Sequence, residues 1–169
     1  MDVTIMVRIQ KYGLSDKEVQ VISFLESKSK RFFKREDICS FFNNYNTLTL
    51  FLRRLLLKGR VVRISKRKYF LVPIYAKKSW VEHSFIVADE LFDCKDYYIG
   101  GKAAAHYWGL IDQIPTVIDI FSKTKQGTKE ILGTKFCFRR IRKFRDFVEK
   151  KIKEHSFLIA TKKESRKWI

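Results

Sequence analysis

Side chains that can hydrogen-bond to DNA bases are concentrated between residues 44 and 54. An asparagine matches the donor and acceptor of adenine, and an arginine matches the two acceptors of guanine. Asn46, Arg53 and Arg54 supply these groups. Their spacing predicts a base-contacting surface on one helix, although most charged helix faces are simply solvated.

Further basic side chains occupy a short run, 65–68, that separates two apolar stretches. Lysines and arginines at such a tip are placed to contact phosphates or the minor groove. Two more, Lys34 and Arg35, open a short predicted helix and are expected beside phosphates. The predicted DNA contacts are Lys34, Arg35, Asn44, Asn46, Thr47, Thr49, Arg53, Arg54, Arg63, Lys66, Arg67 and Lys68.

The net charge of the chain points to a polyanionic partner. There are 36 Lys and Arg residues against 18 Asp and Glu residues, which gives a formal net charge of +18. Such a field attracts nucleic acid first and anionic membrane surfaces second, although a lysine-rich composition alone can produce it. Residues 34–68 carry ten basic and two acidic residues, a net charge of +8. This concentration favours DNA, and no membrane partner is expected because no basic amphipathic helix with exposed aromatics is present.

Catalysis is not expected. Gly100 and Gly101, followed by Asp119, superficially resemble the glycine-rich turn and acidic strand of nucleotidyltransferases. That chemistry needs two or more carboxylates to hold metal ions. Val117 and Phe121 stand where the second acid would lie. The glycines are therefore predicted to form a tight turn at a helix entrance.

The cysteines predict no metal, cofactor or disulfide. Cys39, Cys94 and Cys137 lie far apart, form no Cys-x-x-Cys pair and do not cluster with the histidines. The first residues contain no long apolar segment, and no apolar run approaches the length of a membrane span. These features predict a cytoplasmic protein.

The elements of the first half have the order of a winged helix-turn-helix. Ser15 and Glu18 predict a capping box at the start of a first helix. A second short helix is expected over 34–42 and a third over 47–58, ended by Gly59. The buried face of the third helix is predicted from its apolar spacing to be Leu48, Phe51, Leu52 and Leu55. Strands over 61–64 and 69–72 complete a hairpin.

The second half alternates helices and strands. We expect helices over 80–91, 101–108 and near 146–154, strands over 97–99, 117–121, 135–138 and 157–160, and a polar hairpin or loop over 122–133. The fold class is thus predicted as α+β, with a winged helix-turn-helix over 1–75 and a small α+β domain over 76–169. A possible secondary basic patch consists of Arg139, Arg140, Arg142 and Lys143, followed by Arg145. This patch could extend a DNA footprint, bind an acidic partner or be solvated.

The run from Tyr97 to Pro115, YYIGGKAAAHYWGLIDQIP, resembles the AbiEi family of antitoxins from type IV toxin–antitoxin systems. The resemblance extends over residues 15–164. It implies a winged helix-turn-helix repressor that binds inverted repeats in its own promoter and counters a nucleotidyltransferase toxin. The chain departs from the family where Tyr107 and Trp108 separate His106 from Gly109, and where it ends at Ile169 in place of a helical C-terminal region.

We therefore expect a sequence-specific repressor that binds double-stranded DNA as a homodimer on an inverted-repeat operator. The other class left open is a protein-interaction module. In that case the second half would neutralise a partner toxin, and the winged helix would be mainly a scaffold.

Overall fold

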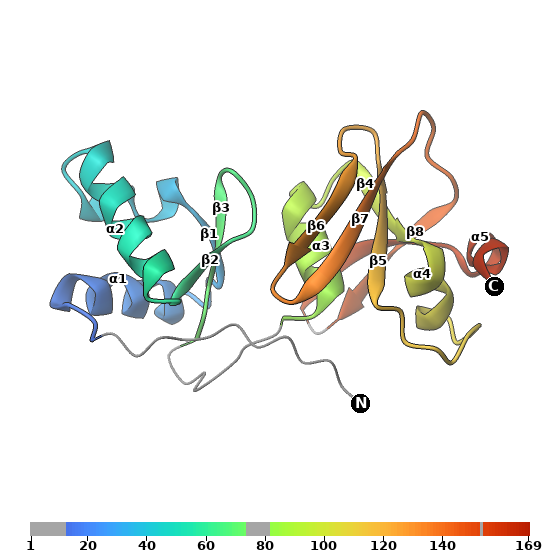
Figure 1. Cartoon of the computed structure of the whole chain (residues 1–169), viewed down its shortest axis with the longest axis horizontal. Coiled ribbons are helices and arrows are strands. Elements are labelled where there is room, and N and C mark those ends of the chain that lie inside the picture. Colours follow the sequence, from blue (N-terminus) through green and yellow to red (C-terminus); the bar gives the residue numbers. More distant parts are fainter. Residues whose placement is uncertain (1–12, 74–81, 153) are drawn as a thin grey trace. The chain divides into compact units, whose positions relative to one another are not determined.

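The computed structural model describes residues 13–73, 82–152 and 154–169. The chain forms two compact units, 1–81 and 82–169, each with its own sheet (Figure 1). The fold is mixed α+β, as the sequence predicted. The domain boundary expected between 75 and 76 lies outside the described residues.

In the first unit, two helices pack against a three-stranded antiparallel sheet of order β1-β3-β2. The central strand β3 pairs with β1 on one side and β2 on the other, so that Phe70 lies opposite both Phe32 and Val62. The elements are α1 (Asp16–Ser27), β1 (Phe32–Lys34), the 3-10 helices η1 (Arg35–Asp37) and η2 (Cys39–Phe41), α2 (Tyr45–Leu57), β2 (Val61–Arg63) and β3 (Lys68–Leu71).

The short helix expected over 34–42 was predicted incorrectly. Lys34 belongs to β1, and η1 and η2 follow as two separate single turns. The Asp37 carboxylate accepts a hydrogen bond from the Lys34 amide at 2.6 Å, which closes the first turn on itself. Ile38 then leaves the helical conformation, with φ −123° and ψ 4°, and it is fully buried. Burial of Ile38 in the core thus interrupts what would otherwise be one continuous helix.

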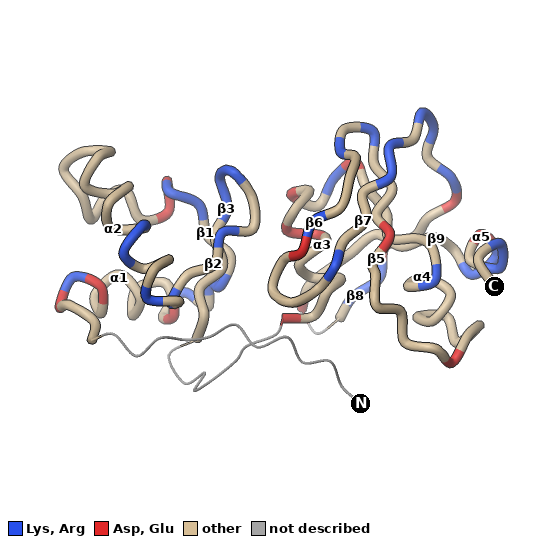
Figure 2. Tube along the Cα trace, in the orientation of Figure 1, with Lys and Arg blue, Asp and Glu red and all other residues tan. Residues whose placement is uncertain are grey.

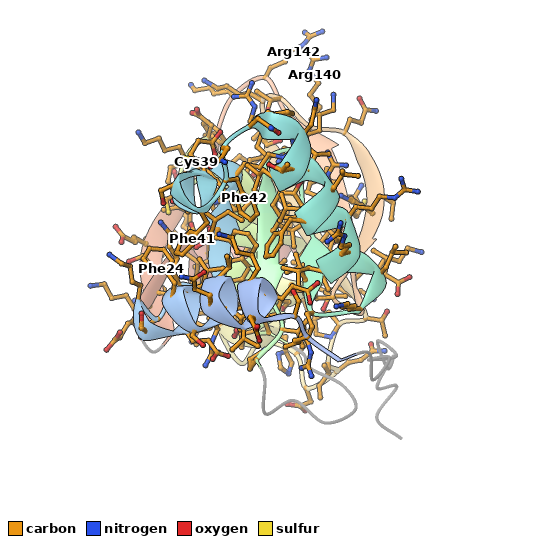
Figure 3. The ribbon with its side chains drawn as sticks, turned by 90° about the vertical axis from the view of Figure 1, so that its left-hand side faces the viewer. Phe24, Cys39, Phe41, Phe42, Arg140 and Arg142 are labelled. Carbon is orange, nitrogen blue, oxygen red and sulfur yellow. The ribbon has the colours of Figure 1, made fainter. Side chains whose placement is uncertain are left out.

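The core of the first unit lies between α1, α2 and the sheet. It contains Val21, Ile22 and Leu25 of α1 together with the predicted buried face of α2. Aromatic side chains extend this core toward the two single turns. Phe24 meets Phe41 edge to face at 5.0 Å between ring centroids, and Figure 3 shows these rings beside α1.

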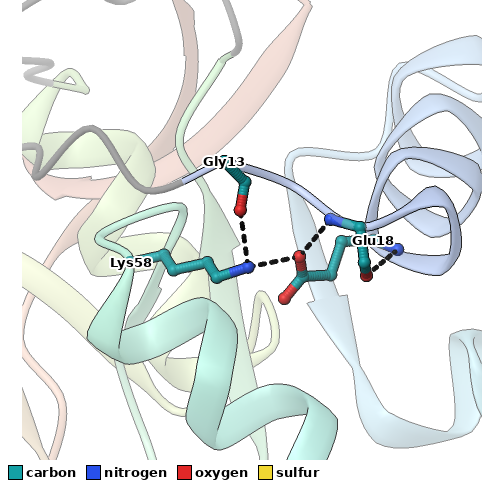
Figure 4. A network of polar contacts seen from close by, with 4 residues as sticks. Gly13, Glu18 and Lys58 are labelled. Carbon is teal, nitrogen blue, oxygen red and sulfur yellow. Dashed lines mark hydrogen bonds and ion pairs between the residues drawn. The ribbon is translucent and has the colours of Figure 1, made fainter.

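A buried ion pair joins the start of α1 to the end of α2 (Figure 4). The predicted capping box is confirmed: Glu18 Oε2 accepts from the Ser15 amide at 2.7 Å, and Ser15 Oγ accepts from the Glu18 amide. The Lys58 ammonium donates to Glu18 Oε2 at 2.5 Å and to the Gly13 carbonyl at 2.8 Å. Since Glu18 is only 2% exposed, this carboxylate depends on its partners for solvation.

Acid is expected to weaken this connection. Burial raises the pKa of Glu18, but the hydrogen bonds from Lys58 and Ser15 and the Lys58 charge outweigh it and hold the pKa below its ordinary 4.5. The unfolded chain therefore takes up the proton at a higher pH than the folded chain does. The stabilisation is complete above pH 4.5 and is lost as the pH falls through the lowered folded pKa.

Urea unfolding at a series of pH values between about 6 and 3 tests this expectation. Replacing Glu18 with Gln should reduce the decline in unfolding free energy that the wild type shows with falling pH. The exposed carboxylate Glu36 provides the matched control, and E36Q should retain the wild-type decline. An unchanged pH profile for E18Q would contradict the assignment.

The second unit is built around a six-stranded sheet of order β6-β7-β5-β4-β9-β8. The β4–β9 and β5–β7 pairs are parallel, and the other neighbours are antiparallel. The elements are α3 (Ser84–Phe92), β4 (Tyr97–Gly100), α4 (Gly101–Tyr107), β5 (Val117–Ser122), β6 (Gly127–Ile131), β7 (Thr134–Arg140), β8 (Phe147–Ile152), β9 (His155–Ala160), α5 (Lys162–Ser165) and the 3-10 helix η3 (Arg166–Trp168).

Buried polar contacts attach α3 to this sheet. The Tyr97 hydroxyl of β4 donates to Asp89 of α3 at 2.7 Å and accepts from the Leu158 amide of β9 at 3.2 Å. The side chain of Tyr97 is fully buried, and this burial together with the Asp89 contact raises its pKa. One phenol therefore connects three elements of the unit.

One expectation for the second unit was wrong: the helix expected near 146–154 is the strand β8. The polar hairpin or loop expected over 122–133 contains the strand β6, which forms an antiparallel hairpin with β7. Exposed and half-buried residues alternate along β8, and its register pairs Phe147 with Ala160. The start of the helix expected at 80 lies outside the described residues, and α3 begins at Ser84 after the His83 cap.

Candidate nucleic-acid interface

The side of α2 that faces away from the core carries the main candidate contacts. Leu48, Phe51, Leu52 and Leu55 are buried, which confirms the prediction made from their spacing. With 3.6 residues per turn, the opposite side of the helix is the outward ridge, defined here as Asn46, Leu50, Arg53 and Leu57. All four are exposed, Leu50 by 51% and Leu57 by 68%. Arg54 is also exposed, beside the ridge.

Three predicted contacts on α2 make hydrogen bonds that shape the helix itself. Asn44 is the N-cap, and its side chain accepts from the Thr47 amide at 2.9 Å. The Thr47 hydroxyl donates to the Asn44 carbonyl, and the Thr49 hydroxyl donates to the Tyr45 carbonyl. A helix interior offers few other partners to short hydroxyl side chains. These residues therefore position the start of α2, while Asn46 and Arg53 are exposed on its outward ridge.

The tip of the β2–β3 hairpin presents two exposed basic side chains, Lys66 and Arg67. The Arg63 guanidinium donates to the carbonyls of Ser65 at 3.1 Å and Lys66 at 3.0 Å, which holds the tip in a compact shape. Lys68 was expected at the tip, but it is only 7% exposed and begins the central strand opposite Lys34. The expectation that Lys68 contacts DNA is corrected on that ground.

Lys34 and Arg35 are half-buried where β1 meets η1. The Arg35 guanidinium donates to the Tyr69 hydroxyl at 3.3 Å and lies 4.8 Å from the centroid of the Tyr45 ring. Tyr45 itself is 64% exposed at the first position of α2. Arg35 thus connects the sheet to the start of α2, where the Tyr45 ring is exposed.

Lysine and arginine dominate the charge of this part of the molecule, as the colouring of α2 and the hairpin in Figure 2 shows. One of the two acidic residues in 34–68, Asp37, is paired with Lys30 at 2.7 Å. Burial raises the pKa of Asp37, but the hydrogen bonds from Lys30 and Lys34 have the larger effect and hold the pKa below its ordinary value. The carboxylate therefore stays ionised and paired with Lys30. The positive field near α2 is therefore little reduced by acidic neighbours.

Sequence reasoning did not include Leu50 among the contact residues. Its exposed position follows from helical spacing, but a leucine carries no hydrogen-bonding group and so gave no signal of recognition. The same reasoning counted Lys68 only because it is basic and adjacent to the tip. Exposure of the side chain, and not residue type alone, separates these two residues.

The secondary basic patch on the second unit contains two arginines that form ion pairs and three further exposed basic residues. Arg139 donates to Asp119 at 2.8 Å, and Arg145 donates to Glu164 at 2.9 Å. Arg140, Arg142 and Lys143 are exposed, and Figure 3 shows Arg140 and Arg142 extending away from the fold. The two paired arginines also remain exposed, with 55% of the Arg139 side chain and 60% of the Arg145 side chain accessible.

The ion pair with Arg139 gives a structural role to Asp119, the carboxylate of β5. A Cβ placed on Gly101, which has φ +63°, would lie 2.3 Å from Asp119 Oδ2. Glycine is therefore required where the helix entrance meets this carboxylate.

Among the described residues, no group of three or more His, Cys, Asp or Glu side chains could hold a metal ion. No helix within the same residues is long and apolar enough to cross a membrane.

The chain was compared with known proteins at the levels of sequence and fold. No family model matches it, and no curated protein matches its sequence. Among solved structures, the crystal structure of the RV2827C protein from Mycobacterium tuberculosis is similar, with a TM-score of 0.61 and 16% identity. The match covers 80% of this chain and 50% of the mycobacterial chain, so this chain spans half of that protein's length. At this identity the likeness concerns the fold alone, and the chain is an α+β protein with a fold similar to that of RV2827C.

Proposed function

We propose that this chain is a sequence-specific transcriptional repressor that binds double-stranded DNA through its first unit. That unit acts as a winged helix-turn-helix, with α2 in the major groove and the β2–β3 hairpin as the wing. The observation that carries the proposal is the outward ridge of α2, on which Asn46 and Arg53 are exposed. The order α1, β1, short turns, α2, β2, β3 supports the same assignment.

The regulatory setting follows from the resemblance to the AbiEi family. In that setting the protein is cytoplasmic and represses its own toxin–antitoxin operon, binding an inverted repeat as a homodimer. Its other partner is a cognate nucleotidyltransferase toxin. The mechanism needs no metal or cofactor, because the exposed side chains and the positive field supply both base contacts and phosphate contacts.

Replacing Arg53 with Ala tests the proposed base contact. We expect R53A to lose about 5- to 150-fold in affinity for a selected duplex, which corresponds to one bidentate base contact of about 1–3 kcal/mol. Affinity for an unrelated duplex should fall much less, because only phosphate attraction is reduced. Fluorescence anisotropy with both duplexes measures the two losses.

The matched control is Arg166→Ala, which removes an exposed arginine from η3 in the second unit. R166A is expected to bind the selected duplex with wild-type affinity. Equal binding by R53A and the wild type would place the DNA-binding face elsewhere.

A second candidate function, a protein-interaction module that neutralises a toxin, is favoured by the solvent-facing residues Arg140, Arg142 and Lys143. An acidic surface of a partner protein would complement them. Co-purification of the full chain with a nucleotidyltransferase encoded by a neighbouring gene would support this function, provided that the R53A variant forms the same complex. Retention of DNA binding without such a complex would favour repression alone.

A further inference from the structure

An exposed leucine lies in the middle of the polar part of the outward ridge. Leu50 is 51% exposed, with Asn46 one turn before it and Arg53 one turn after it. Arg54 is exposed close by on the same helix. Isolated surface leucines are common, so exposure alone assigns no role. The position of Leu50 between two side chains suited to base contacts is what distinguishes it.

Helical geometry places these three side chains within reach of neighbouring base pairs. At a rise of about 1.5 Å per residue, Leu50 lies about 6 Å along the axis from Asn46 and about 4.5 Å from Arg53. The three residues together cover about 10 Å, which corresponds to roughly three base steps of 3.4 Å. A ligand contacted by both polar side chains therefore also meets Leu50.

The chemistry of the major groove supplies an apolar partner for this side chain. Each A·T pair presents the C5 methyl of thymine there, beside the donors and acceptors of the bases. We propose that Leu50 is a specificity-determining residue that packs against a thymine methyl. That thymine lies between the bases contacted by Asn46 and Arg53. This inference rests on the proposed function, because it assumes that α2 enters the groove.

The charge around Leu50 favours DNA over a second copy of the chain as the occupant of this face. Arg53 and Arg54 lie beside it, and Asp37 in the same region is already paired with Lys30. Two such ridges packed together would bring like charges into contact, which is costly when water is excluded. A duplex, in contrast, offers phosphates to the arginines and a methyl group to the leucine.

The test begins with the full chain and a random pool of duplex DNA, from which binding sequences are selected. Each thymine of the selected half-site is then replaced by uracil, which removes the methyl and keeps the base pair. Replacing the contacted thymine in one half-site should lower the wild-type affinity by about fourfold, the value for one buried methyl. L50A should bind the thymine and uracil duplexes equally, with the weaker affinity.

Val19 of α1 provides the control, because it is an apolar side chain 43% exposed outside the outward ridge. V19A is expected to discriminate uracil from thymine as the wild type does. Discrimination retained by L50A, or absent from the wild type, would overturn the inference and leave the proposed function standing. If the selection enriches no sequence, both the inference about Leu50 and the proposed function fail. A loss of self-association by L50A in sedimentation velocity, without any effect of uracil, would assign the face to a second copy instead.

Discussion

Raising the salt concentration from about 50 to 200 mM is expected to weaken duplex binding by about 10³- to 10⁵-fold, as for six to ten phosphate contacts. The expectation rests on the exposed basic side chains of the first unit. Besides the proposed base contact Arg53, the side chains of Arg54, Lys66 and Arg67 are exposed in each copy, and the two copies of the proposed complex supply six of them. Each phosphate that these side chains neutralise releases condensed counterions, and added salt opposes that release.

The slope of this salt dependence also distinguishes the roles of individual residues. Lys66→Ala should weaken binding to selected and unrelated duplexes alike and reduce the slope by about one for each bound copy. Lys162→Ala, an exposed lysine in α5 of the second unit, is the matched control and should keep the wild-type slope. Binding that is absent or insensitive to salt contradicts the proposed function. A wild-type slope for K66A contradicts the position of the wing.

The substitution Leu52→Ala is expected to lower the unfolding free energy of the first unit by about 2–5 kcal/mol. The Leu52 side chain is only 1% exposed and belongs to the core shared by α1, α2 and the sheet. Truncation removes buried methyl groups and leaves a cavity that rigid neighbours fill only in part. The loss is a large fraction of the stability of a small unit, so duplex binding should decline with it.

Leu50→Ala offers a matched control two residues away on the same helix. Because Leu50 is 51% exposed, its truncation should change the unfolding free energy by less than about 0.5 kcal/mol. Urea unfolding followed by circular dichroism, compared with duplex binding on the same samples, separates the two leucines. Equal stability of L52A and L50A would contradict the assignment of the buried face of α2.

Local patterns predicted much of the first unit correctly. The capping box of Ser15 and Glu18 involves residues three apart, so its hydrogen bonds depend little on the rest of the chain. The helix end was also predicted from one residue: Gly59 follows the C-cap of α2 with φ +66°. Within a helix, the period of 3.6 residues determines which side chains share a face.

The errors occur where long-range pairing decides the conformation. Residues 147–152 carry charges that suit a helix surface, yet they form β8 because hydrogen bonds to β9 satisfy their backbone. Strand propensity depends strongly on such neighbours, which a local pattern does not include. Burial of Ile38 in the core similarly divided one expected helix into two single turns.

The candidate site shows the same division between sequence and tertiary structure. The sequence by itself determined the start of α1, the buried face of α2 and the concentration of positive charge in 34–68, because these depend on residue type and local spacing. Only the tertiary structure decided which basic residues reach solvent. Lys68 is buried because β3 is the central strand, with β1 and β2 on either side, whereas Lys66 and Arg67 lie beyond the ends of the strands. Exposure at the tip is thus set by strand pairs that join residues far apart in the chain.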